Sequence, residues 1–340
     1  MQTAFLRTAL VCCAGALLSA CGGAEVAETP AAPATQVVAE ACSAESRADA
    51  RARRPALEEA ALAAAQESRG AGAPALWKMS DEDTVVYLFG TVHLLRPDMQ
   101  WQTPVIEAAI ASADTVVFEA DVSSPEAQRE LMKFYTGQGF FADGTQLTSL
   151  LSGTETEELT EALQLVDLPV EALQPYKPWM AAINISVKQM IDEGFDPEAG
   201  VEKVIERAAL EHGASFAFLE TVDDQLGGLA GLGNCEQIDF LMATVDGLED
   251  GTAALDLLVD EWADGDVNGL GALMSNPEML GSQPIYDAMM TDRNARWVPK
   301  IEVMLESPGT VLVAVGAGHL AGEGSVIEML REKGHVVEGP

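Results

Sequence analysis

The chain has 340 residues, and its 54 acidic residues against 19 Lys and Arg give a formal charge of −35. Such an excess of acid argues against binding to nucleic acid or to an anionic lipid surface, because both need clustered basic residues. Apolar residues make up 48% of the chain, enough for a large core, so we assign the charge to the solvated surface of a folded protein.

Residues 1–20 have the pattern of a secretory signal. One basic residue, Arg7, precedes an apolar run that is too short to span a bilayer. The segment Leu18-Ser19-Ala20-Cys21 resembles a bacterial lipoprotein box, which implies cleavage before Cys21 and lipidation of its thiol. Gly22 resembles the residue found there in outer-membrane lipoproteins. We therefore expect a periplasm-facing lipoprotein of the cell envelope. The alternatives are an ordinary signal peptide cut elsewhere and a chance match.

The next two segments lead into the main domain. Residues 21–43 comprise the predicted lipidated Cys and a tether rich in Ala, Pro, Val and Glu. Residues 44–74 predict a helix, interrupted at Pro55, and a Gly/Pro linker. The arginines of this helix predict a solvated or acid-paired face. Residues 75–340 then form the main domain.

Cysteine usage favours one disulfide. If the signal is cleaved and Cys21 is lipidated as expected, Cys12 and Cys13 are removed, and Cys42 and Cys235 are the two cysteines left in an oxidising compartment. A bond between them would pin the N-terminal helix to the main domain. The alternative is two free thiols.

The main domain predicts an α/β fold, with a mixed central sheet flanked by helices and a helical insertion in the second half. Four short apolar runs read as buried strands, and helix-like segments alternate with them. The strands are expected at 84–89, 114–118, 214–219 and 310–315, and the helices at 103–113, 154–165, 178–193 and 200–211. From about 226 to 294 the chain is expected to be mostly helical, with its methionines in the core.

A Gly-x-x-His-Leu motif occurs twice, each time at a predicted strand end. The copies begin at Gly90 and Gly316 and contain His93 and His319. Each Gly is expected to permit a tight turn that presents the His above the sheet edge. Glu119 and Glu220 end two other strands. Functional groups gather beyond the carboxyl ends of strands in such sheets, so these residues predict one shared site.

Two kinds of chemistry suit this set of residues. Two imidazoles with one or two carboxylates can hold a divalent metal ion that activates water. Without a metal, a His beside a Glu gives a general base held in orientation by a carboxylate. Local capping by the two histidines is the structural alternative.

Three other features are less specific. Arg293 is a candidate clamp for a substrate carboxylate or a partner of Glu119 or Glu220, with a salt bridge within its helix as the alternative. His212 is expected at a helix end, where its charge suits the helix dipole. His335 is expected near the start of a last strand, in a structural role.

At these residues the sequence resembles the TraB/GumN family, which is related to the Tiki-type metalloproteases. The resemblance spans residues 75–338 and rests on these segments: 76–78, 88–94, 118–119, 177–179, 200–202, 219–221, Gln225, 293–294 and 315–320. It implies a compact α/β fold with both motifs lining one cleft. His93, Glu119 and His319 map onto metal and catalytic positions of the family. Glu202, Glu220, Arg293 and Asn294 map onto further characteristic polar positions.

Our first hypothesis is a lipid-anchored, metal-dependent hydrolase with a peptide or small-molecule substrate, and a peptidase is the candidate activity. His93, His319 and Glu119 would hold Mn²⁺, Co²⁺ or Zn²⁺, Glu220 would act as base or further ligand, and Arg293 would assist. The second hypothesis is a non-catalytic protein that binds a peptide, haem or a glycan in the same place.

Overall fold

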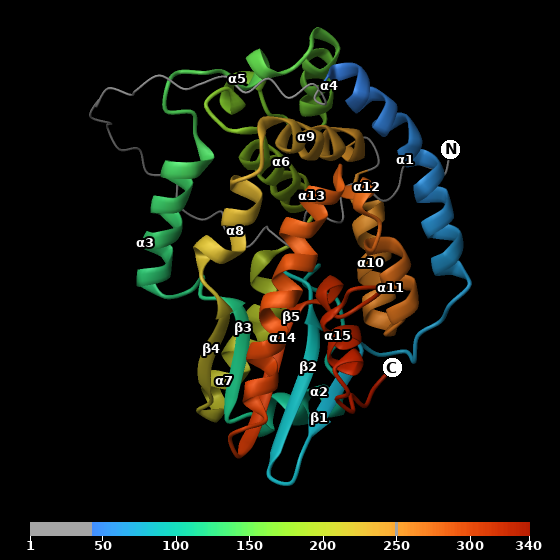
Figure 1. The fold of residues 1–340 in the computed structure, drawn as a ribbon, viewed down its shortest axis with the longest axis vertical. Helices are drawn as coiled ribbons and strands as arrows, with labels where there is room; N and C mark the ends of the chain where they lie inside the picture. The colour runs from blue at the N-terminus through green and yellow to red at the C-terminus, as the bar shows by residue number, and fades with distance from the viewer. Residues whose placement is uncertain (1–42, 249–250) are drawn as a thin grey trace.

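The computed structural model describes residues 43–248 and 251–340, and it is an α/β structure built on one mixed sheet of five strands (Figure 1). The strand order is β1-β2-β5-β3-β4, in which β1 pairs antiparallel with β2 and the other neighbours are parallel. The strands are β1 (Leu76–Ser80), β2 (Thr84–Thr91), β3 (Thr115–Ala120), β4 (Ser215–Glu220) and β5 (Gly309–Gly316). The predicted fold class is therefore confirmed.

Helices make up most of the rest of the described chain. The first half contains α1 (Ala44–Gln66), α2 (Pro104–Ser112), α3 (Pro125–Phe134), α4 (Gly153–Leu163), α5 (Val170–Leu173), α6 (Pro178–Asp192) and α7 (Val201–His212). The second half contains α8 (Val222–Ala230), α9 (Asn234–Gly247), α10 (Ala253–Asp264), α11 (Val267–Met274), α12 (Pro277–Leu280), α13 (Gln283–Tyr286), α14 (Asp292–Met304) and α15 (Val326–Glu332). No helix among the described residues is apolar over a stretch long enough to span a bilayer.

The central strand β5 is buried on both faces because its side chains alternate between two hydrophobic clusters. Leu312 and Ala314 join the larger cluster, which extends into the helical layer around α6 and α9. Val313 and Val315 join the smaller one, with Trp297 of α14 and residues of α15. This burial explains the continuous apolar run that the strand shows in sequence. The five methionines between residues 242 and 290 are all buried, as predicted.

Three local expectations were wrong, and one strand was missed. The predicted strand at 214–219 is β4, but only its last two residues, Leu219 and Glu220, are buried, because β4 lies at the edge of the sheet, and Phe218 is 42% exposed. The helix α1 continues through Pro55 without a break. Strand β1 was not predicted, because its five residues acquire their structure only by pairing with β2. At the C-terminus there is a single bridge between Lys78 and Glu338 in place of a last strand.

Ion pairs help to hold α1 together on either side of its proline. On one side of Pro55, Arg47 binds Glu155 and Arg51 binds Glu158 and Asp246; next to the proline, Arg54 binds Asp246 as well. These contacts hold the helix against α4 and α9 and offset the backbone hydrogen bond that a proline cannot make. The acid-paired version of the arginine face is therefore the correct one.

Candidate functional site

The two Gly-x-x-His motifs lie side by side because β2 and β5 are parallel neighbours in register. Thr91, at the end of β2, is opposite Gly316, at the end of β5. A Cβ atom on Gly90 would lie 2.9 Å from the Cα of Ala317, inside the second motif. Neither Gly90 nor Gly316 has a positive φ angle, so a tight turn is not the reason for glycine at Gly90. The reason is the close approach of the two motifs.

Arg293 lies at the centre of the carboxylates that end β3 and β4. It comes from α14, and its Nη2 donates to Glu119 at 2.5 Å and to Glu220 at 2.5 Å. Its Nε donates to Glu220 at 3.0 Å, and its guanidinium carbon lies 4.8 Å from the ring centre of Trp297. The side chain is only 3% exposed. Of the roles predicted for Arg293, the structure therefore agrees with the one in which Arg293 pairs with Glu119 and Glu220.

Glu119 is held by three donors and remains ionised. The backbone N–H of Gly316 donates to one of its oxygens at 2.7 Å, while Arg293 and Gln225 donate to the other. Burial alone would raise its pKa, but Arg293, His319, His93 and the Gly316 hydrogen bond together lower the pKa to about 2.

Glu220 differs from Glu119 in its balance of burial and charge. Burial raises its pKa, the nearby charge of Glu119 raises it further, and Arg293 offsets these effects only in part. The indole N–H of Trp297 donates to Glu220 at 3.1 Å. Its side chain is 2% exposed, so water does not reach it readily.

His319 is fully buried rather than presented above the sheet edge, which corrects the expectation from sequence. Its Nδ1 lies 2.6 Å from Oδ1 of Asn294, and its Nε2 lies 3.2 Å from Nη1 of Arg293. Because an amide oxygen and a guanidinium can only accept and donate respectively, Nδ1 carries the proton and Nε2 accepts. Burial, with the charge of Arg293, lowers the pKa of His319 to about 3, so the ring is neutral.

His93 occupies the more accessible side of the same cluster. Its Nδ1 lies 2.6 Å from Oε1 of Glu202, and the two side chains are 12% and 23% exposed. The hydroxyl of Thr91 donates to the same oxygen at 2.5 Å. Burial would raise the pKa of Glu202, but His93 and Thr91 outweigh it and lower the pKa. His93 also lies close enough to Glu119 and His319 to affect their pKa values.

A close backbone contact brings α7 to His93. A Cβ atom on Gly200 would lie 2.1 Å from the carbonyl oxygen of His93, and the N–H of Val201 donates to Val92 at 3.0 Å. Only glycine therefore permits the start of α7 to approach the first motif and place Glu202 against the imidazole.

The structure thus brings together all of the polar residues singled out around the two motifs. It also gives roles to three residues to which no prediction had assigned one: Thr91, Gly200 and Trp297. Trp297 follows Arg293 by one helical turn, and its ring centre lies 4.4 Å from that of His319. The spacing of four residues between Arg293 and Trp297 places both side chains on one face of a helix. Only the tertiary structure shows that this face is directed towards the strand ends.

His212 and His335 lie apart from this cluster. His212 is the last residue of α7, as predicted, and His335 lies 2.8 Å from Glu302 on the surface of α14. Both therefore have structural positions.

The predicted metal ligands are engaged with one another and with Arg293. Among residues 43–248 and 251–340, no three His, Cys, Asp or Glu side chains are arranged to hold a metal ion. His319 Nε2 and Glu119 Oε1 are 3.9 Å apart, and both side chains bind Arg293. A metal at these residues would first have to displace the guanidinium, so the arrangement as it stands does not fit the ion.

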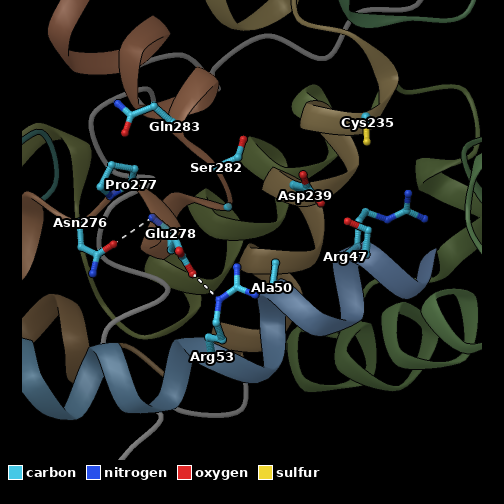
Figure 2. Close-up of a pocket in the computed structure, with 12 residues that line it drawn as sticks. Arg47, Ala50, Arg53, Cys235, Asp239, Asn276, Pro277, Glu278, Ser282 and Gln283 are labelled. Carbon is cyan, nitrogen blue, oxygen red and sulfur yellow. Dashed lines mark hydrogen bonds and ion pairs between the residues drawn. The ribbon is translucent and has the colours of Figure 1, made fainter. Parts of the chain in front are cut away.

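A cavity of about 390 Å³ lies away from this cluster, between α1, α9 and the α12–α13 segment (Figure 2). Of the residues predicted to matter, only Cys235 lines it. Cys235 is disulfide-bonded, and Cys42, its predicted partner, lies outside the described residues, so the pairing of the two stays a prediction.

The fold and the strand-end cluster define an α/β protein with paired Gly-x-x-His motifs. The chain belongs to the TraB/PrgY/gumN family, whose model matches residues 75–339. It is 25% identical over 248 residues to "Uncharacterized protein YbaP" of Escherichia coli (strain K12), covering 72% of this chain and 87% of that protein. The protein of the same name from Shigella flexneri matches to the same extent. No solved structure matches the chain significantly.

Proposed function

We propose that the protein is a hydrolase of peptide bonds in which His93 is the general base and Glu202 orients it. The observation that carries this proposal is the contact of 2.6 Å between His93 Nδ1 and Glu202 Oε1. A carboxylate accepts the Nδ1 proton, which leaves Nε2 as the basic nitrogen. The partial exposure of both side chains supports access by water and substrate, in contrast to the full burial of His319.

In the proposed reaction, Nε2 of His93 removes a proton from a water molecule as its oxygen bonds to the substrate carbonyl carbon. The Glu202 carboxylate stabilises the imidazolium that forms. When the C–N bond breaks, the imidazolium returns the proton to the leaving amine. This assignment gives His93 the role of base that the sequence had suggested for Glu220, which is nearly inaccessible and bound to Arg293 and Trp297.

The test is a peptide-cleavage screen with the purified chain and two variants. We expect His93→Gln and Glu202→Gln each to lower kcat/KM by about 10²–10⁴-fold, the usual contribution of a positioned base. Glu206→Gln is the matched control, because Glu206 lies one turn further along α7 and pairs with Lys203 instead. Equal rates in all four proteins would contradict the proposal.

Two further outcomes would favour a different function for the protein. Activity that is lost on chelation and restored by Mn²⁺, Co²⁺ or Zn²⁺ would support the metal-dependent version of the hydrolase. Binding of peptide, haem or glycan without turnover, dependent on His93, would support the non-catalytic alternative.

We also propose that the protein is attached to the outer membrane through acyl chains on Cys21 and faces the periplasm. The support is the signal pattern and lipoprotein box of residues 1–21. We expect metabolic labelling with a palmitate analogue to mark the chain in a bacterial host and the mark to disappear in Cys21→Ser. Cys235→Ser is the control and should stay labelled. Labelling that survives in Cys21→Ser would contradict the proposed anchor.

A further inference from the structure

Arg293 uses every hydrogen-bond donor that its guanidinium possesses. Nε donates to Glu220, and the two protons of Nη2 go to Glu119 and Glu220. The two protons of Nη1 go to the carbonyl of Met289 at 3.2 Å and to Nε2 of His319 at 3.2 Å. Each unsatisfied donor on a buried arginine costs free energy, and this site satisfies all five donors of Arg293.

The partners of Arg293 are oxygen and nitrogen atoms that also suit a divalent metal. They comprise carboxylate oxygens of Glu119 and Glu220 and the imidazole Nε2 of His319, the donor types that Zn²⁺ and Mn²⁺ prefer. Asn294 fixes the His319 tautomer so that the lone pair of Nε2 faces the guanidinium. The same lone pair would be needed for a metal bond, so the two cations compete for it.

The net charge of the strand-end cluster also requires a cation between the two carboxylates. Two ionised carboxylates and one guanidinium leave a net charge of −1 on the cluster, whereas the carboxylates alone would carry −2 within a buried volume. Removing the arginine would therefore leave two uncompensated negative charges in a buried place, which binding of another cation or of a proton would stabilise.

We propose that Arg293 is the built-in cation of the strand-end cluster, which occupies the place of a divalent metal at Glu119, Glu220 and His319. The second Gly-x-x-His motif then serves to hold this arginine, and His319 is a positioning residue. The inference does not depend on the general base assigned to His93, and its test measures binding rather than activity.

The experiment is titration of the purified chain with MnCl₂ and with ZnCl₂, followed by calorimetry and by thermal unfolding. We expect no binding to the wild-type cluster. Arg293→Gln is expected to bind one ion with an affinity on the order of 100-fold or more above the weakest binding that the wild-type titration could detect, the scale set by losing one buried charged partner. The ion should also raise the Tm of Arg293→Gln, and both effects should vanish when Glu119→Gln is added.

The matched control is Arg296→Gln, because Arg296 lies on the exposed face of the same helix and donates to the backbone carbonyl of Asp224 rather than to Glu119 or Glu220. It should behave as wild type. A folded Arg293→Gln that gains no affinity would overturn the inference. If Arg293→Gln does not fold, the titration of the wild-type chain decides the question. One ion bound per wild-type chain, with an affinity that falls in His319→Gln and in Glu119→Gln, would overturn the inference. The absence of such an ion would support it.

Discussion

Replacing Glu119 by Ala is expected to lower the free energy of unfolding by about 3–5 kcal/mol, the usual cost of breaking a buried ion pair from one side. The substitution leaves Arg293 with fewer partners in a place where its side chain is 3% exposed. It also removes the acceptor for the buried N–H of Gly316. A loss of this size approaches the whole stability of many single domains, so the variant should be at least partly unfolded at 37 °C.

The measurement is equilibrium unfolding in urea, with Glu126→Ala as the control. Glu126 also pairs with an arginine, Arg129, but the two side chains are 74% and 67% exposed. That variant should differ from wild type by less than about 1 kcal/mol. Similar stabilities for Glu119→Ala and Glu126→Ala would show that the network around Arg293 is not formed.

Acid is expected to destabilise the protein because of His319. Its folded pKa is lowered to about 3, whereas an unfolded histidine titrates near 6.5. Between these values only the unfolded chain binds the proton, so this contribution is complete above about pH 6.5 and is lost as the pH falls towards 3. Between pH 6.5 and 4.5 the loss should reach roughly 2–3 kcal/mol.

Glu119 extends the same trend to lower pH. Its pKa is lowered from 4.5 to about 2, so its contribution is lost as the pH falls from 4.5 towards 2. Glu220 acts in the opposite direction, because its raised pKa lets the folded protein take up a proton first. Asp239, whose pKa burial raises to about 6, also opposes the histidine between pH 6.5 and 4.5, so the comparison of wild type with His319→Gln is what isolates the histidine.

The check is a series of unfolding curves from pH 8 to pH 4.5 for wild type, His319→Gln and His212→Gln. His319→Gln should lose most of the slope between pH 6.5 and 4.5. His212 lies at the exposed end of α7, and its replacement should leave the slope as it is. A wild-type slope that His319→Gln retains would mean that the imidazole is not buried and neutral.

Local sequence patterns were sufficient for most of the elements. The apolar runs that become β2, β3 and β5 are largely buried strands because near-continuous apolar residues suit a sheet covered on both faces. The run that becomes β4 forms a strand as well, but at the edge of the sheet, where only Leu219 and Glu220 are buried. The same patterns placed a polar residue at each strand end, and parallel strands bring their ends to one edge. That is why Glu119, Glu220 and the two motifs could be assigned to one site.

Other elements needed the tertiary structure. β1 forms because it pairs with β2, and α1 continues through Pro55 because Arg47, Arg51 and Arg54 pair with acids on α4 and α9. The sequence indicates that these arginines need acidic partners, but it does not indicate which acidic residues they pair with. Long-range pairing supplied that information in both cases.

By itself, then, the sequence determined the fold class and the group of residues that meet at the strand ends, since both follow from periodicity and the direction of the strands. Only the tertiary structure decided how those residues divide their roles. The approach of α14 places Arg293 between Glu119 and Glu220 and buries His319, while Gly200 lets α7 bring Glu202 to His93. The contacts of Arg293 with both glutamates and of Glu202 with His93 join segments more than 70 residues apart, whereas those of His319 with α14 span about 25 residues. None of these contacts can be inferred from local sequence patterns.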